Sequence, residues 1–322
     1  MVRAGSAKLK NKWSNVANMD EIQINQSSPG PANRDRFLGV SIIIGALIIG
    51  GAWVYSQSSG ANPETFNAEI IAKLGKNVLP EKGVVLSVKW GDLGKQLIEN
   101  GTIDQKKFED LYNQRGDIDE ETKKLLTGTD NGQLVINKDN ANTLLNLLWA
   151  FGLGNKNPIL EKGPMSDKKY GGAGKFASTG GWTLATRSSM DHYSQHTMVP
   201  LTAEQQALVE EVSKNIYRPC CGNSTYFPDC NHGMAMLGLL ELMASQGVNE
   251  ADMYKAALAV NSYWFPDTYL NIAQYFKLQG IEWKKVVAKE VLGANFSSAA
   301  GYNNILKKIK PVEQQGSGSC GV

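Results

Sequence analysis

Residues 37–55 read FLGVSIIIGALIIGGAWVY, an apolar run of nineteen residues without a charged side chain. A helix of this length extends over about 30 Å, which matches the hydrocarbon layer of a bilayer. Trp53 and Tyr55 end the run, where aromatic rings favour the membrane interface. The segment therefore predicts a single transmembrane helix, with the lipid bilayer as its partner.

The charges on either side of this run predict its orientation. After it, the next cation is Lys73, whereas before it the sequence carries Arg3, Lys8, Lys10, Lys12, Arg34 and Arg36. The positive-inside rule then places the N-terminus in the cytoplasm and the chain from Ser56 onward outside. A cleaved signal peptide is the alternative, but its charged region is normally much shorter than residues 1–36. We expect an uncleaved signal anchor in the cell membrane.

Composition divides the chain into segments. The predicted order is a disordered cytoplasmic tail (1–36), the anchor (37–55), a linker (56–63), an N-terminal helical subdomain (64–155), a Gly-rich irregular segment (156–199), a C-terminal helical subdomain (200–310) and a flexible tail with a cysteine (311–322). The predicted extracytoplasmic part is long enough to bury an ordinary hydrophobic core without the support of disulfides or metal ions.

Apolar residues recur at helical spacing through most of the exported part. The expected helices are 65–74, 92–99, 104–112, 140–151, 202–217, 231–245, 249–263, 268–278, 282–292 and 299–309. Strand signal is confined to 83–90 and 134–136. The predicted fold class is mainly α: a single N-terminal transmembrane helix followed by an all-α (minor β) extracytoplasmic domain.

Composition also excludes several classes of function. The net charge of +2 offers no positive field for nucleic acid, so we expect no nucleic-acid partner. Four cysteines in 322 residues are too few for a disulfide-built scaffold. No G-x-S-x-G elbow, H-E-x-x-H helix or Walker A loop occurs in the sequence, and the scattered carboxylates form no evident catalytic pair. The sequence does not indicate an enzyme.

One segment, RPCCGNSTYFPDCNHGMAM (218–236), gathers soft ligand types. It contains Cys220, Cys221, Cys230 and His232, which include three of the four cysteines. Thiolate and imidazole together select copper(I), zinc or an iron–sulfur centre over magnesium or calcium. Cys230 precedes a predicted helix, whose N-terminus favours the thiolate form. We predict a copper or zinc site made by these four residues.

A second segment, MDHYSQHTM (190–198), contains the remaining two histidines, His192 and His196, between Met190 and Met198. Together with Met234 these residues are candidates for a secondary copper-handling site, because thioether and imidazole suit copper(I). Met236 and Met243 share a helical face with apolar residues, so we assign them to the core.

Two alternatives use the same cysteines without metal. Cys230 paired with Cys220 or Cys221 would staple a loop onto a helix, giving a cell-envelope module that binds a protein or glycan partner. Alternatively, a low-pKa Cys230 with a resolving partner, such as Cys320 on its Gly-Ser tail, would give a thiol–disulfide redox protein. Metal ligands must be reduced, a staple must be oxidised, and a redox protein must alternate between the two states.

Overall fold

The computed structural model describes residues 63–114, 116, 118–309 and 311, all of which belong to one compact unit, Gly60–Val322. The predicted cytoplasmic tail (1–36), the predicted anchor (37–55), the predicted linker except Pro63, and the predicted C-terminal tail except Pro311, with Cys320, lie outside the described residues. Among the residues that are described, no helix is both long and apolar enough to cross a bilayer.

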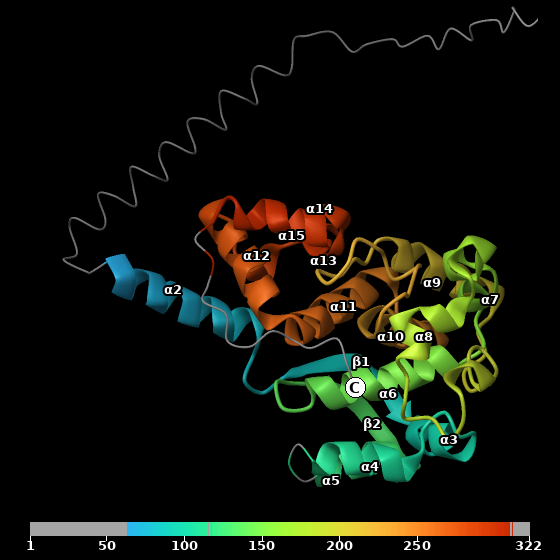
Figure 1. Cartoon of the computed structure of the whole chain (residues 1–322). Coiled ribbons are helices and arrows are strands. Elements are labelled where there is room, and N and C mark those ends of the chain that lie inside the picture. Colours follow the sequence, from blue (N-terminus) through green and yellow to red (C-terminus); the bar gives the residue numbers. More distant parts are fainter. Residues whose placement is uncertain (1–62, 115, 117, 310, 312–322) are drawn as a thin grey trace, which may run out of the picture. The chain divides into compact units, whose positions relative to one another are not determined.

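The unit is mainly helical, with one sheet of two strands (Figure 1). Its first part contains α2 (Pro63–Val78), β1 (Val84–Gly91), α3 (Leu93–Glu99), α4 (Gln105–Asn113), α5 (Glu120–Thr127), β2 (Asn131–Ile136) and α6 (Ala141–Gly154). Its last part contains α9 (Ala203–Lys214), α10 (Asn231–Ser245), α11 (Glu250–Trp264), α12 (Pro266–Leu278), η5 (Trp283–Lys285), α13 (Ala288–Leu292), α14 (Ala294–Ser297) and α15 (Ala299–Leu306). The mainly α prediction is confirmed for this region.

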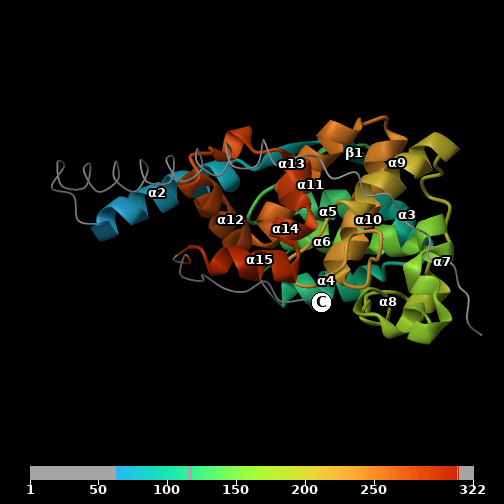
Figure 2. The same ribbon diagram turned by 90° about the horizontal axis from the view of Figure 1, so that it is seen from above.

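Helices α6 and α10 form the centre of the core, and they lie side by side in both views (Figures 1 and 2). Almost every residue of both helices is buried. The helices approach closely at Gly152 and Gly238, where an added Cβ would stand 2.2 Å from the carbonyl oxygen of Met234 and 2.7 Å from that of Leu148. Only glycine permits this spacing, because a side chain at either position would collide with the facing backbone.

The two strands, which are separated in the chain by α3, α4 and α5, form an antiparallel sheet beside these helices. Val84 pairs with Ile136 and Gly91 with Asn131, with an irregularity in register between them. Alternate residues of β1 are buried, as expected for a strand with one face on the core. Strand signal at 83–90 and 134–136 is thereby confirmed.

Several predicted helix boundaries match closely because they depend on local signals. Helix α10 has the predicted bounds. Helix α9 begins at its predicted position with a capping box, in which Thr202 and Gln205 exchange side-chain and backbone hydrogen bonds. Helix α5 was not anticipated, although Asp119 caps it by accepting from the Thr122 N–H. The predicted helix 282–292 is wrong as a single element, because the extended backbone at Val286 and Val287 separates η5 from α13.

The Gly-rich segment 156–199 consists of short helical turns: α7 (Pro158–Lys162), η1 (Pro164–Ser166), η2 (Lys168–Tyr170), η3 (Ala173–Lys175), α8 (Ala177–Gly180) and η4 (Ser189–Asp191). Two buried indoles connect it to the helical parts. Trp149 Nε1 of α6 donates to the Ser178 carbonyl at 2.6 Å, and Trp182 Nε1 donates to the Thr102 carbonyl at 2.8 Å. The segment is therefore packed onto α6, despite its irregular backbone.

Candidate metal centre

The cysteines lie on and beside the loop that joins α9 to α10. Backbone hydrogen bonds fix the start of the loop, where Tyr217 N–H donates to Leu292 O at 2.8 Å and Thr225 N–H donates to Ile216 O at 2.8 Å. Cys220 is exposed, whereas Cys221 and Cys230 are half-buried. The loop ends at Cys230, the extended N-cap residue of α10, so this sulfur lies at the positive end of the helix dipole.

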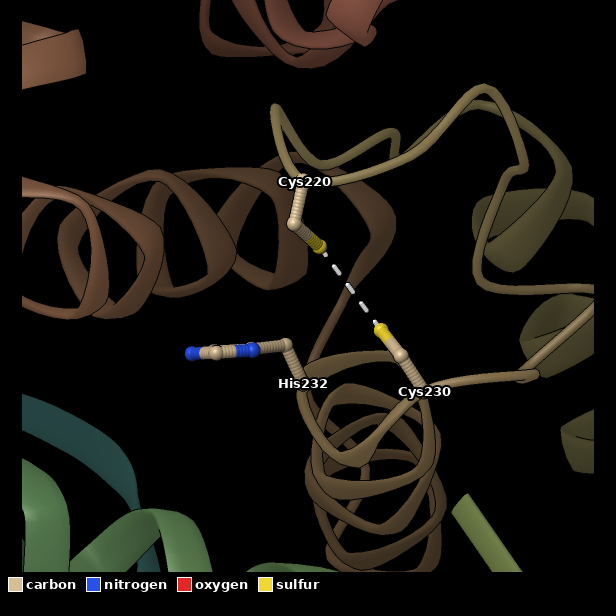
Figure 3. A group of neighbouring side chains, drawn as sticks. All are labelled: Cys220, Cys230 and His232. Atoms are coloured by element: carbon tan, nitrogen blue, oxygen red, sulfur yellow. Dashed lines mark hydrogen bonds between the residues drawn. The ribbon is translucent and has the colours of Figure 1, made fainter. Parts of the chain in front are cut away.

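Two of the predicted ligands face each other across this loop. The Sγ atoms of Cys220 and Cys230 point toward one another at 3.7 Å (Figure 3). This separation is far from the length of about 2.05 Å in a disulfide bond. It is close to the distance of about 3.8 Å that separates two thiolates bound at about 2.3 Å to one tetrahedral ion. The sulfur atoms are thus already at chelating distance.

His232 completes a group of three. It is 3 % exposed, and its ligand atom lies within 4.8 Å of both sulfurs, to one side of the sulfur pair (Figure 3). The ring packs against Phe265 at 4.4 Å and Trp264 at 5.6 Å between centroids, contacts that hold it in place. An imidazole positioned in this way loses little conformational freedom when it binds an ion.

Cys221 belongs to a second, overlapping group. Its sulfur lies 3.9 Å from the Asn223 carbonyl oxygen and 4.0 Å from Asp229 Oδ1, and the ligand atoms of Cys221, Asp229 and Cys230 all lie within 4.8 Å of one another. The four predicted residues and Asp229 therefore form two groups of three that share Cys230. Asp229 is not among the predicted residues, although its position directly before Cys230 is a usable signal.

Arg218 is the other residue that the sequence analysis missed. Its side chain is 2 % exposed and forms an ion pair with Asp229, and its Nε donates to Cys230 Sγ at 3.0 Å. Hydrogen bonds from the Cys220 and Cys221 thiols, the guanidinium charge of Arg218 and a hydrogen bond from His232 hold the pKa of Cys230 well below its usual range, although burial opposes this. These contacts favour the thiolate form of Cys230, which is the form that binds metals and attacks disulfides.

The candidate secondary residues lie elsewhere in the structure's described part. His192 Nδ1 and His196 Nε2 are 3.1 Å apart, and the pKa of each is lowered, mainly by burial. Met198 Sδ accepts a hydrogen bond from Asn100 at 3.3 Å, and Met190 is largely exposed.

Met234 is fully buried within the hydrophobic core. Among the described residues, groups of at least three His, Cys, Asp or Glu ligand atoms occur only around Cys230. The two histidines thus remain a pair.

Comparisons with protein-family models, curated proteins and solved structures found no match to this chain.

Proposed function

We propose that this protein binds a soft metal ion, copper or zinc, through Cys220, Cys230 and His232. The observation that supports this most directly is the 3.7 Å separation of the Cys220 and Cys230 sulfurs, with an imidazole within 4.8 Å of both. Two thiolates and one imidazole are the donors that copper(I) and zinc prefer. Magnesium and calcium, which take oxygen ligands, are disfavoured at such a site.

The exposure of the three ligands supports a role in metal exchange. His232 is buried and Cys230 half-buried, so both are held by their surroundings, whereas Cys220 is exposed. Structural zinc sites are normally closed by four protein ligands. An exposed thiolate can be displaced by an incoming donor, which favours storage or delivery of the ion over purely structural support.

We further propose that the centre lies outside the cytoplasm, anchored to the cell membrane by residues 37–55 with the N-terminus inside. The support is the apolar run and the one-sided distribution of cations around it. In that compartment an envelope protein is the natural partner for exchange. In a Cys320→Ser background treated with chelator, a membrane-impermeant thiol reagent applied to intact cells should modify Cys220, and the added Cys220→Ser substitution should lower that label. Labelling only after lysis would place the domain inside.

The metal proposal is tested on the full-length chain, purified in detergent without chelator. Metal content is measured by mass spectrometry beside a count of free thiols. We expect about one equivalent of copper or zinc, the number that one chelating thiolate pair holds, with thiols protected until a chelator is added. Cys230→Ser should abolish loading, and Cys320→Ser, which removes a thiol distant in sequence, is the matched control. Metal-free protein whose thiols appear only after reduction would contradict the proposal.

A thiol–disulfide redox function is the second candidate, favoured by the lowered pKa of Cys230 and its proximity to Cys220. The Cys230 thiolate would attack a substrate disulfide, form a mixed disulfide and release one substrate thiolate. Attack by the Cys220 thiolate on Cys230 would then release the second substrate thiolate and leave Cys220 bonded to Cys230. Reduction of a model disulfide that is insensitive to chelator, and lost in Cys220→Ser, would favour this candidate.

A further inference from the structure

Arg218 is a buried charge whose donors are engaged in several directions at once. Its Nε donates to Cys230 Sγ, its Nη1 to Asn223 O at 3.2 Å, and its Nη2 both to Phe227 O at 3.0 Å and to the Asp229 carboxylate. The first turn of α10 makes room for this group. An added Cβ at Gly233 would stand 2.6 Å from Arg218 Cζ, so the guanidinium lies directly against the helix backbone.

The Arg218 guanidinium donates hydrogen bonds to the second group of candidate ligands, where a metal ion would otherwise bind. Of its members Cys221, Asp229 and Cys230, two already accept hydrogen bonds from Arg218. The other carboxylate oxygen, Asp229 Oδ2, accepts from Asn223 Nδ2 at 2.8 Å. A metal ion there would have to displace those hydrogen bonds and bring a second positive charge beside a buried cation, where repulsion is poorly screened.

We infer that Arg218 acts as a built-in cation that closes the second group, limits the centre to one ion with three protein ligands, and thereby disfavours zinc relative to copper(I). This inference rests on the proposed metal-binding function. Copper(I) is satisfied by three soft donors, whereas zinc in structural sites takes four. Repulsion from the guanidinium also acts twice as strongly on a divalent as on a monovalent ion. Cys221 is the fourth ligand that Arg218 withholds.

The test uses the full-length chain in detergent, titrated anaerobically with copper(I) or zinc(II) against chromophoric chelators. We expect wild type to bind about one copper(I) ion, as three soft donors allow, and Cys220→Ser to lose it. Cys221→Ser should leave the copper(I) stoichiometry and affinity unchanged. Arg218→Gln should raise zinc affinity about tenfold or more, a change of about 1.4 kcal/mol, and the added Cys221→Ser substitution should cancel that gain. Arg187→Gln, which removes an exposed arginine, is the matched control.

The outcomes separate this inference from the function on which it rests. If wild type binds copper(I) but Cys221→Ser lowers its affinity tenfold or removes an equivalent, Cys221 is a ligand and the role given to Arg218 is wrong, while the metal function stands. Binding of two ions by wild type would also contradict the role given to Arg218. If wild type binds neither ion, both ideas fail together. The Cys221→Ser comparison decides the question even where Arg218→Gln does not fold, because Cys221 is a half-buried loop residue.

Discussion

Replacing Gly152 by alanine should destabilise the protein, because it forces apart the two helices at the centre of the core. The new Cβ would lie 2.2 Å from the Met234 carbonyl oxygen, whereas ordinary contacts begin at 3.4 Å. The obstacle is backbone, which cannot rotate aside, so α6 and α10 must separate by about 1 Å in a densely packed interior. Overpacking of this kind costs about 1–3 kcal/mol.

Helix propensity opposes this cost, since alanine in a helix is favoured over glycine by up to about 1 kcal/mol. With the full propensity gain, the net loss is up to about 2 kcal/mol, or a fall in Tm of up to roughly 8 °C for a unit of this size. Thermal unfolding followed by circular dichroism measures it. The copper affinity should fall as well, because Met234 lies one turn from Cys230, whose carbonyl accepts its N–H at 3.0 Å.

Gly75→Ala is the matched control for this substitution. Gly75 also lies inside a helix, α2, but an added Cβ there meets nothing within 4 Å. Only the propensity gain then applies, so we expect this variant to be more stable by about 0.5–1 kcal/mol. If Gly152→Ala shifts Tm upward like Gly75→Ala, the close approach of α6 and α10 does not exist and the reasoning is refuted.

Three further predictions follow from single side chains. Burial raises the pKa of Glu241 well above its usual value, so the stability that protonated Glu241 contributes is complete below its pKa in the unfolded chain and is lost as pH rises toward its pKa in the folded protein. Glu241→Gln should therefore gain stability relative to wild type as pH rises, by up to about 1.4 kcal/mol per pH unit. Urea unfolding measured across pH tests this, and parallel stability curves for the two proteins would refute it. His232→Ala should weaken copper(I) binding at least about tenfold in chelator competition while His196→Ala leaves it unchanged, and equal losses would implicate the histidine pair instead. Thr202→Ala should lower the free energy of unfolding by about 1 kcal/mol through loss of the α9 cap, without altering metal content.

Local signals in the sequence determined much of the secondary structure. Helix α10 has its predicted bounds because its apolar run begins directly after Cys230, the N-cap residue. Helix α9 begins where its capping box places it. These features depend on residues three or four positions apart, so a single sequence contains the whole signal. The same holds for the gathering of Cys220, Cys230 and His232, which lie within one short segment.

The composition of the centre was decided by the tertiary structure. The sequence placed Cys221 with the other three predicted ligands, but the fold turns it toward Asp229, into a group already engaged by Arg218. Nothing local distinguishes Arg218 from an exposed arginine. Its burial requires Gly233 to present bare backbone and Asp229 to supply the countercharge, and those contacts exist only once the loop has closed onto α10. The spacing of residues along the chain determines which candidate ligands are available. The packing of the buried Arg218 guanidinium, whose charge must be paired, determines which of these ligands lie together.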